Sequence, residues 1–187
     1  MGTDLSKYDN YGYHPGGSII KRCLWFVCNS IVFKTSLMPF WGPKVRLLRI
    51  FGARVGKGVV IKPNVNIKYP WHLEIGDYVW LGENCWIDNL TTVKIGNNSC
   101  LSQGACLVCG NHDYKDPHFG LMVQEILLEE GVWIGAKAIV CGGTVCHRHS
   151  VLLVGSVAKG DLLEYGIYQG NPAIKVRERV FRQNSHM

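Results

Sequence analysis

The sequence predicts an all-β protein with short helices, built as a parallel β-helix. The main observation is a six-residue repeat that runs from Val55 to about Val157. An aliphatic residue, once replaced by cysteine, opens each hexad, and a small or β-branched residue usually follows four positions later. A second observation is that the spacing breaks at every third hexad. The anchor residues are Val55, Ile61, Ile67, Ile75, Leu81, Ile87, Ile95, Leu101, Leu107, Leu128, Ile134, Val140, Cys146 and Leu152.

The period of six decides the architecture. It fits neither an α-helix nor a simple hairpin, whereas hexapeptide periods are typical of parallel β-helices. Each hexad is expected to form one short strand and a corner, and three hexads form a triangular coil. The anchors of successive coils then stack inside as aliphatic ladders. The 22 glycines of the chain suit a fold with many tight corners.

The three breaks predict where the chain leaves the coil. The intervals from Ile67 to Ile75 and from Ile87 to Ile95 each hold two extra residues, and the interval after Leu107 holds fifteen. Because the breaks recur every third hexad, all three extensions leave the same corner. The third, residues 111–126, carries Asn111-His112-Asp113-Tyr114. Long loops in compact repeats are commonly functional, so the chemistry is expected here.

Residues 1–54 are expected to form an N-terminal arm and helices. Residues 1–17 read as an irregular arm, and Ser18 is a candidate N-cap for a helix that continues to Val32. The segment from Pro39 to Pro43 interrupts the chain. Residues 44–51 then predict a short basic and apolar helix that leads into the first coil.

Residues 55–160 are assigned to the β-helix, and residues 161–187 to a C-terminal tail with a short helix. The hexads fade after Leu152, and a turn follows at residues 170–173. Pro172 suits the first turn of a helix, and several cations follow it. The tail is therefore predicted to end in a basic helix.

The composition of the chain narrows the range of possible functions and partners. The formal net charge of +6 is mild and no long basic run is present, so nucleic acid is not expected as a partner. The first twenty residues do not read as a signal peptide. Several of the eight cysteines fall within the hexads, where cysteine serves as a small hydrophobe. We therefore expect a cytoplasmic protein with free thiols.

The N-terminal helix leaves two interpretations open. Its uncharged run, residues 23–33, is eleven residues long, about half of the roughly 20 needed to span a bilayer. Packing against the β-helix or a neighbouring subunit is the favoured interpretation. However, Lys21, Arg22, Trp25 and Phe26 suit an interfacial helix, so peripheral contact with the inner face of the membrane is the second.

Four motifs together resemble one family. They are the hexads, the loop motif at residues 111–114, the run Val132-Trp133-Ile134-Gly135-Ala136, and the turn Gly170-Asn171-Pro172-Ala173. In this order they resemble the hexapeptide-repeat acyl-CoA O-acetyltransferases, above all the branch of colanic-acid and exopolysaccharide biosynthesis. The resemblance covers about residues 37–182.

The resemblance implies a left-handed parallel β-helix, which is a known exception to right-handed crossovers. It also implies a homotrimer with active sites in the clefts between neighbouring subunits. Acetyl-CoA is the implied cosubstrate, and no metal is expected. The implied reaction is transfer of acetyl from acetyl-CoA to a hydroxyl of a sugar or glycolipid in surface polysaccharide biosynthesis.

Two residues match the family's catalytic positions. His112 matches the histidine that acts as general base, and an imidazole with a pKa of about 6.5 suits this task near neutral pH. Ala136 matches a position whose backbone N–H faces the thioester carbonyl and donates to the oxyanion. Asp113 is expected to orient His112 or to contact the acceptor.

The resemblance also implies contacts to the two substrates. Aromatic, backbone and cationic groups would line the cofactor, the cations lying near its phosphates. These residues are Trp133, Gly135, Ala136, Val154, Gly155, Lys159, Asn171, Pro172, Ala173 and Lys175. On the acceptor side, indole, carboxylate and amide groups suit a sugar. The residues assigned to the acceptor are Trp86, Asp88, Asn89 and Asp113.

Three other functions compete with this interpretation. A zinc enzyme of the γ-carbonic-anhydrase type could use His112, His118, His147 and His149, although the ligand spacing of that family is not matched. A non-catalytic β-helix scaffold would make His112 and the basic tail incidental. A hexapeptide-repeat nucleotidyltransferase would need a fused nucleotide domain, for which the chain has no room.

Overall fold

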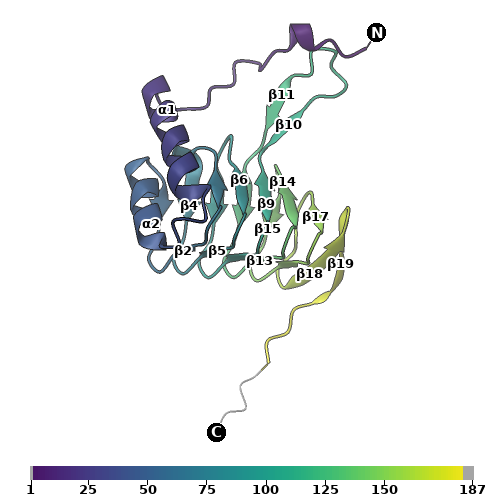
Figure 1. The fold of residues 1–187 in the computed structure, drawn as a ribbon. Coiled ribbons are helices and arrows are strands. Elements are labelled where there is room, and N and C mark those ends of the chain that lie inside the picture. Colours follow the sequence, from purple (N-terminus) through teal and green to yellow (C-terminus); the bar gives the residue numbers. More distant parts are fainter. Residues whose placement is uncertain (1, 183–187) are drawn as a thin grey trace.

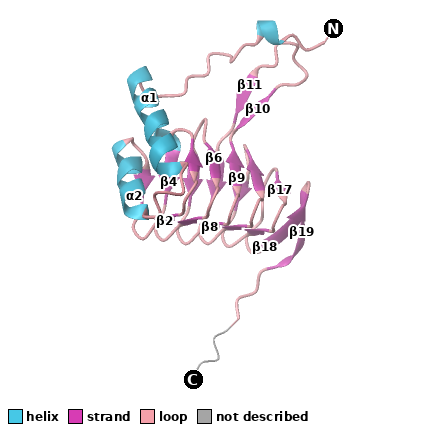
Figure 2. Cartoon of the chain, in the orientation of Figure 1, coloured by secondary structure: helices cyan, strands magenta, loops and turns pink. Residues whose placement is uncertain are grey.

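The computed structural model describes residues 2–182 and shows a left-handed parallel β-helix with helices at one end (Figure 1). The chain coils through three sheets, so the fold class predicted from the hexads is confirmed. Two helices pack at the start of the coil, and a hairpin projects from its side (Figure 2).

The three sheets take consecutive hexads in turn. Sheet A contains β1 (Arg54–Val55), β4 (Leu73–Ile75), β7 (Val93–Ile95), β12 (Ile126–Leu128) and β15 (Val145–Cys146). Sheet B contains β2 (Val60–Ile61), β5 (Trp80–Leu81), β8 (Cys100–Leu101), β13 (Trp133–Ile134), β16 (Val151–Leu152), β18 (Gly166–Gly170) and β19 (Ala173–Glu178). Sheet C contains β3 (Asn66–Ile67), β6 (Trp86–Asp88), β9 (Cys106–Val108), β14 (Ile139–Cys141) and β17 (Val157–Ala158).

The anchors stack inside the coil as predicted. In sheet B, Ile61, Leu81, Leu101, Ile134 and Leu152 lie in register and are fully buried. Corresponding ladders run through the other two sheets. Because each side chain covers the one below it, the ladders form a continuous apolar core along the axis.

Glycine follows an anchor where two coils come into backbone contact. A Cβ on Gly135 would lie 2.6 Å from Val154 N and 2.8 Å from Leu152 O. A Cβ on Gly96 would lie 2.6 Å from the carbonyl carbon of Glu129. Since these neighbours are backbone atoms that cannot turn aside, any larger residue would force the coils apart.

The buried cysteines behave as small hydrophobes. All eight cysteines are free thiols. Burial raises the pKa of both Cys85 and Cys146 to about 12. They therefore stay neutral near pH 7, in agreement with the expectation of free thiols.

The N-terminal helices match their predicted positions closely. Helix α1 (Ile19–Cys28) begins after Ser18, whose side chain accepts a hydrogen bond from Lys21 N, and it continues as a π-helical turn, Asn29–Phe33. Helix α2 (Trp41–Ile50) starts three residues earlier than predicted, with Pro43 tolerated in its first turn. Trp25 anchors α1 by donating from Nε1 to Ile67 O at 2.9 Å.

The short 3-10 turns and the hairpin complete the elements. The turns cover Leu5–Lys7 in the N-terminal arm and Pro70–His72 in the first corner extension. The hairpin consists of β10 (Gly110–His112) and β11 (Leu121–Val123). All three extensions connect sheet C to sheet A, so the prediction that they share one corner is confirmed.

The predicted C-terminal basic helix is wrong. Strand β18 continues sheet B beyond the predicted end of the coil, and residues 173–178 form β19, which pairs with β18 antiparallel. The tight turn at residues 170–173 returns the chain along the open edge of β18. Ile174 and Val176 alternate with cations, a period of two that suits a strand. Residues 183–187 of the predicted tail lie outside the described part of the chain.

None of the helices within residues 2–182 is both long enough and apolar enough to cross a bilayer.

The ladders predict a strong dependence of stability on a central anchor. We expect Leu101→Ala to lower the free energy of unfolding by about 2–5 kcal/mol, because the coils above and below cannot close the cavity. Denaturant unfolding checks this. Ile174→Ala, at an exposed side chain, is the control and should change stability by less than about 0.5 kcal/mol. Equal effects would contradict the ladder as the main source of stability.

Candidate active site

The hairpin at the third extension carries His112. Strands β10 and β11 pair antiparallel, with His112 opposite Leu121. The hairpin stands away from the body of the coil (Figure 1). His112 is half-buried, and its ring stacks on that of Phe119 with the centroids 4.4 Å apart and the planes 9° apart.

A backbone carbonyl fixes the tautomer of His112. Its Nδ1 lies 3.0 Å from Phe119 O. Because a carbonyl oxygen only accepts hydrogen bonds, Nδ1 must carry the proton when the ring is neutral. Nε2 then holds a free lone pair, as a general base requires. The side chain of Asp113 instead accepts from Lys115 N at 3.0 Å, so Phe119 supplies the orienting contact that the sequence assigned as one option to Asp113.

The N-terminal arm holds the hairpin. Tyr11 donates from its hydroxyl to Asp116, and this bond raises the pKa of the phenol to about 12, so it remains a donor near neutral pH. Tyr11 also covers Gly120, where an added Cβ would clash with its ring. Tyr8 places its ring edge-on to His112, with the centroids 6.0 Å apart. The arm therefore packs on the segment that positions the imidazole.

A groove lies at the corner between sheets B and C. Its volume is about 300 Å³, and it brings together the predicted residues Trp133, Gly135, Ala136 and Val154. The indole Nε1 of Trp133 donates to Ser102 Oγ at 2.9 Å, which fixes the orientation of a partly exposed ring. The lining is mainly apolar, with Leu152 and Leu153 in its wall.

The Ala136 backbone is presented at this groove. Its carbonyl accepts from Gly155 N at 2.9 Å, which pins the turn to the next coil. No acceptor for the Ala136 N–H is present within residues 2–182. An N–H held in a fixed turn and left without an acceptor can donate to a ligand oxygen.

The hairpin and the groove occupy different corners of the coil. His112 lies in the connection from β9 to β12, between sheets C and A. Ala136 lies in the turn from β13 to β14, between sheets B and C. Sheet C stands between them within one chain, so the structure does not bring these two catalytic candidates together.

The outer face of sheet C carries two of the acceptor candidates. Trp86 is exposed at the start of β6, and Asp88 lies at its end. Lys68 Nζ lies 3.4 Å from Asp88 Oδ1, an ion-pair distance without hydrogen-bond geometry. This buried oxygen has no hydrogen-bond donor among the described residues. The Asp88 carboxylate is therefore held mainly by its ion pair with Lys68.

The acceptor role assigned to Asn89 is wrong. Its side chain is fully buried. Asn89 Oδ1 accepts from Tyr69 N at 3.1 Å, and Nδ2 donates to Tyr69 O at 2.5 Å. Because both ends of the amide are used by the backbone of the preceding extension, Asn89 stabilises the corner and cannot reach a sugar.

The cations of the last coil differ in their surroundings. Lys159 is exposed after β17, and Lys175 on β19 pairs with Glu178, which raises the pKa of the ammonium. The turn between the two C-terminal strands contains Asn171, Pro172 and Ala173. Arg179, by contrast, donates to Gly131 O and His149 O and is held by the fold.

The remaining histidines do not form a cluster. His147 lies 3.3 Å from Glu129 through Nδ1. His149 packs against Tyr165 and Phe181, with ring centroids 5.0 and 5.5 Å away. Within the described part of the chain, no three His, Cys, Asp or Glu side chains converge as metal ligands. The ligand set that the zinc alternative needs is therefore not assembled in the described residues.

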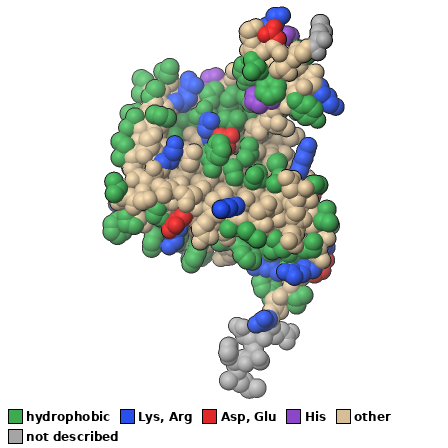
Figure 3. Space-filling view, turned by 45° about the vertical axis from the view of Figure 1, so that its right-hand side comes forward, with side chains coloured by type: hydrophobic (Ala, Val, Ile, Leu, Met, Phe, Trp, Pro, Cys, Tyr) green, Lys and Arg blue, Asp and Glu red, His purple; other side chains and the backbone are tan. Residues whose placement is uncertain are grey.

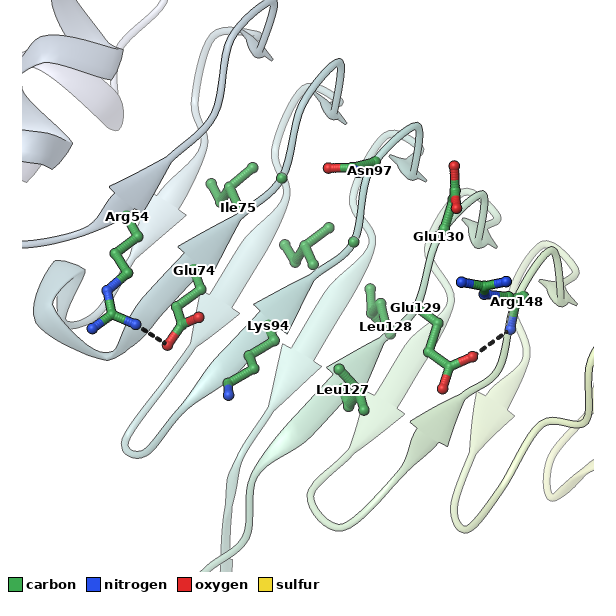
Figure 4. A pocket seen from close by; sticks show the side chains of 13 residues that line it. Arg54, Glu74, Ile75, Lys94, Asn97, Leu127, Leu128, Glu129, Glu130 and Arg148 are labelled. Atoms are coloured by element: carbon green, nitrogen blue, oxygen red, sulfur yellow. Dashed lines mark hydrogen bonds and ion pairs between the residues drawn. The ribbon is translucent and has the colours of Figure 1, made fainter.

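A shallow concavity of about 550 Å³ over sheet A is not a candidate site (Figure 4). Its charged side chains balance in sign, with three cations (Arg54, Lys94, Arg148) and three carboxylates (Glu74, Glu129, Glu130). Arg54 lies 3.3 Å from Glu74, and Glu129 accepts from Arg148 N at 2.9 Å. None of the predicted site residues lines it. We interpret it as a self-neutralising outer face of the sheet.

Comparison with known proteins identifies the family. No family model matches the chain. A putative colanic acid biosynthesis acetyltransferase of Escherichia coli, WcaF, is 35% identical over 177 residues, which cover 95% of this chain and 97% of that protein. The chain belongs to the hexapeptide-repeat acetyltransferases of the colanic-acid type. A galactoside O-acetyltransferase of Escherichia coli is 26% identical over 71% of this chain and 66% of its own length.

Solved structures of other hexapeptide-repeat acetyltransferases share the fold. One, from Vibrio cholerae and complexed with acetyl coenzyme A, has a TM-score of 0.79 at 17% identity, over 94% of this chain and 97% of that chain. A galactoside acetyltransferase in complex with coenzyme A has a TM-score of 0.70 at 22% identity, over 85% and 80%.

Sequence reasoning missed the residues that surround His112 in this acetyltransferase. Phe119 acts through its carbonyl and its ring, and Tyr8 and Tyr11 arrive from an arm about one hundred residues away in sequence. A carbonyl can come from any residue type, so composition gives no signal for it. The tyrosines of the arm were visible, but no periodicity connected them with the loop.

The contact between arm and hairpin predicts a change in local stability. In Tyr11→Ala, we expect the amides of residues 110–123 to exchange with solvent several times faster, because the hairpin loses both the Asp116 bond and the cover over Gly120. Hydrogen–deuterium exchange followed by mass spectrometry checks this. Tyr114→Ala, at an exposed side chain of the same hairpin, is the control and should leave exchange unchanged. Unchanged exchange in Tyr11→Ala would show that the arm does not hold the hairpin.

Proposed function

We propose that this acetyltransferase transfers acetyl from acetyl-CoA to a hydroxyl of a sugar during surface polysaccharide biosynthesis. The observation that carries the proposal is the bond from His112 Nδ1 to Phe119 O, which leaves Nε2 as a base. The 35% identity to the putative colanic acid biosynthesis acetyltransferase supports the pathway class, and the acetyl-CoA complex of a structural relative supports the donor.

The proposed reaction transfers one proton and creates one negative charge, and a group of this chain is assigned to each. His112 Nε2 takes the proton of the acceptor hydroxyl as its oxygen attacks the thioester carbonyl. The carbonyl oxygen becomes an oxyanion, to which the Ala136 N–H donates. When the intermediate collapses, the bond from carbon to sulfur breaks and the imidazolium returns its proton to the leaving thiolate. The products are the acetylated sugar and free coenzyme A.

The groove and the last coil would bind the cofactor. In this proposal the pantetheine arm follows the apolar groove beside Trp133, Gly135 and Val154. Gly155 and the turn at residues 171–173 approach it through the backbone. Lys159 and Lys175 would pair with the phosphates, because cations contact phosphate oxygens through short, charge-assisted hydrogen bonds.

The separation of the two corners supports a homotrimer. Because sheet C divides the His112 hairpin from the Ala136 groove in one chain, a complete site needs a groove from a neighbouring copy. In a cyclic assembly, each cleft would receive the hairpin of one subunit and the groove of the next. The site would therefore be made only on assembly.

The acceptor would lie against sheet C beside the hairpin. The carboxylate of Asp88, which pairs with Lys68, and the exposed indole of Trp86 suit the hydroxyls and the apolar face of a sugar ring. Asp113 at the hairpin is a third contact in this proposal. The acceptor class is a sugar or a glycolipid intermediate. A lipid-linked acceptor would bring the enzyme to the cytoplasmic side of the membrane as a peripheral protein.

Removal of the base tests the mechanism. We expect His112→Ala to lower kcat by about 10²–10⁴-fold, because general-base catalysis typically contributes this much. Release of thiol from acetyl-CoA, measured with a panel of sugar and glycolipid acceptors, reports the rate, and equilibrium binding of coenzyme A should be retained. His118→Ala, near the tip of the same hairpin, is the matched control and should keep the wild-type rate. A His112→Ala variant as active as wild type would refute the role of His112.

A further inference from the structure

The solvent-exposed side of α1 is apolar. A helix on the surface of a soluble protein ordinarily turns its polar side outward. In α1 and its π-helical extension the exposed fractions are instead 68% for Ile19 and Ile20, 58% for Leu24, 71% for Phe26, 53% for Val27 and 67% for Ile31. The opposite side carries the buried Trp25 and the half-buried cations Lys21 and Arg22.

The apolar surface continues beyond α1. The connection to α2 and α2 itself expose Leu37, Phe40, Trp41 and Ile50, with Leu37 exposed to 92%. Figure 3 shows hydrophobic side chains at the surface of the end that carries the helices, with Lys and Arg among them. A single exposed apolar side chain is ordinary, but a helix side made of them indicates a binding surface.

The charge of this region is of one sign. Residues 10–73 contain ten Lys and Arg and no Asp or Glu, whereas the whole chain has 20 basic and 14 acidic residues. The ten cations are Lys21, Arg22, Lys34, Lys44, Arg46, Arg49, Arg54, Lys57, Lys62 and Lys68. All but the fully buried Lys44 lie at least partly at the surface. The region therefore favours an anionic partner.

A groove beside α1 combines both properties. It has a volume of about 490 Å³ and lies between α1 and the first strand of sheet C. Its lining includes the apolar Ile19 and Phe26 together with the cations Arg22, Lys34 and Lys68. Arg22 Nε is buried and has no hydrogen-bond partner among the described residues. Such a groove suits a phosphate with an attached hydrocarbon chain.

We propose that α1 and the adjoining groove dock on an anionic phospholipid surface, with α1 lying in the membrane interface. Apolar side chains enter the boundary of the acyl chains, while Arg22 and Lys34 contact lipid phosphates. A symmetric pair of two copies that meet through this surface fits less well, because it would bring cations against cations.

The position of α1 connects this surface with the active site. Helix α1 and the His112 hairpin project from the same side of the β-helix (Figure 1). Docking through α1 would hold the hairpin near the membrane, where a lipid-linked sugar presents its hydroxyls. The membrane binding stands on its own observations, whereas its use for delivery of the acceptor rests on the proposed function.

Vesicle co-sedimentation tests the surface on the full chain. We expect binding to phosphatidylcholine vesicles that contain phosphatidylglycerol, and little binding to phosphatidylcholine alone. The double variant Arg22→Gln/Lys34→Gln should bind about 25-fold more weakly, since each cation near an anionic surface contributes about fivefold. The pair Lys94→Gln/Arg177→Gln removes the same charge elsewhere and should change binding much less.

The apolar contribution has its own pair of variants. Ile20→Asp/Leu24→Asp should abolish binding, while Ile174→Asp/Val176→Asp on β19 should leave it intact, because all four side chains are exposed and only the first two lie on α1. Wild-type binding by the first pair, or equal binding to neutral vesicles, would overturn the proposal. If Ile20→Asp/Leu24→Asp changed the molecular mass of the protein in solution, the proposal would also be overturned, because α1 would then contact another subunit.

The chain supplies a reporter of its own. Cys23 is an exposed thiol on α1, between the apolar side chains. Phosphatidylglycerol vesicles should slow its reaction with a charged, membrane-impermeant thiol reagent, and an unchanged rate would contradict docking through α1. Transfer to a water-soluble acceptor separates the two proposals. The α1 variants should keep that activity, so a failure of docking would leave the proposed reaction standing.

Discussion

The structure depends on backbone contact between successive coils. Glycine after an anchor lets one coil lie directly on the next, as at Gly135 against Val154 N, and the aliphatic ladders fill the space inside. Since each coil must return to the same three corners, additional residues can leave only as extensions of a corner. The His112 hairpin is such an extension, and the Ala136 turn is a corner. The same stacking therefore sets the core and the positions of the two candidate catalytic groups.

The sequence predicted the periodic features of the fold and missed the contacts between residues that are far apart in the chain. The anchors, the common corner of the extensions and the Ser18 cap all follow from local patterns, and the structure confirms them. The C-terminal strand was mistaken for a helix, because Pro172 and the cations that follow favour a helix locally. The open edge of β18, which binds that strand, exists only in the folded coil. Asn89 was mistaken for a ligand contact for a related reason, since its partner is the backbone of another extension.

In the proposed site, too, some groups could be predicted from the sequence and others could not. His112 could be found from its motif, but the group that sets its tautomer is the carbonyl of Phe119, which carries no signature in sequence. The Ala136 side chain is irrelevant to its proposed role, which uses only an N–H left without an acceptor in the described residues. Candidate reactive side chains can be predicted from residue types, whereas the backbone groups that orient and stabilise them are recognised only in the folded chain. The proposed site then needs two copies, because sheet C separates its two halves.

Complementation between inactive variants tests this central claim most directly. His112→Ala removes the base from the hairpin, and Val154→Arg blocks the groove with a long charged side chain. Each variant alone should be inactive. When the two are unfolded together and refolded in equal amounts, we expect about a quarter of the wild-type activity, because one cleft in four would combine an intact hairpin with an intact groove. A mixture as inactive as its parents, with hybrid assemblies shown to have formed, would contradict a site shared between subunits.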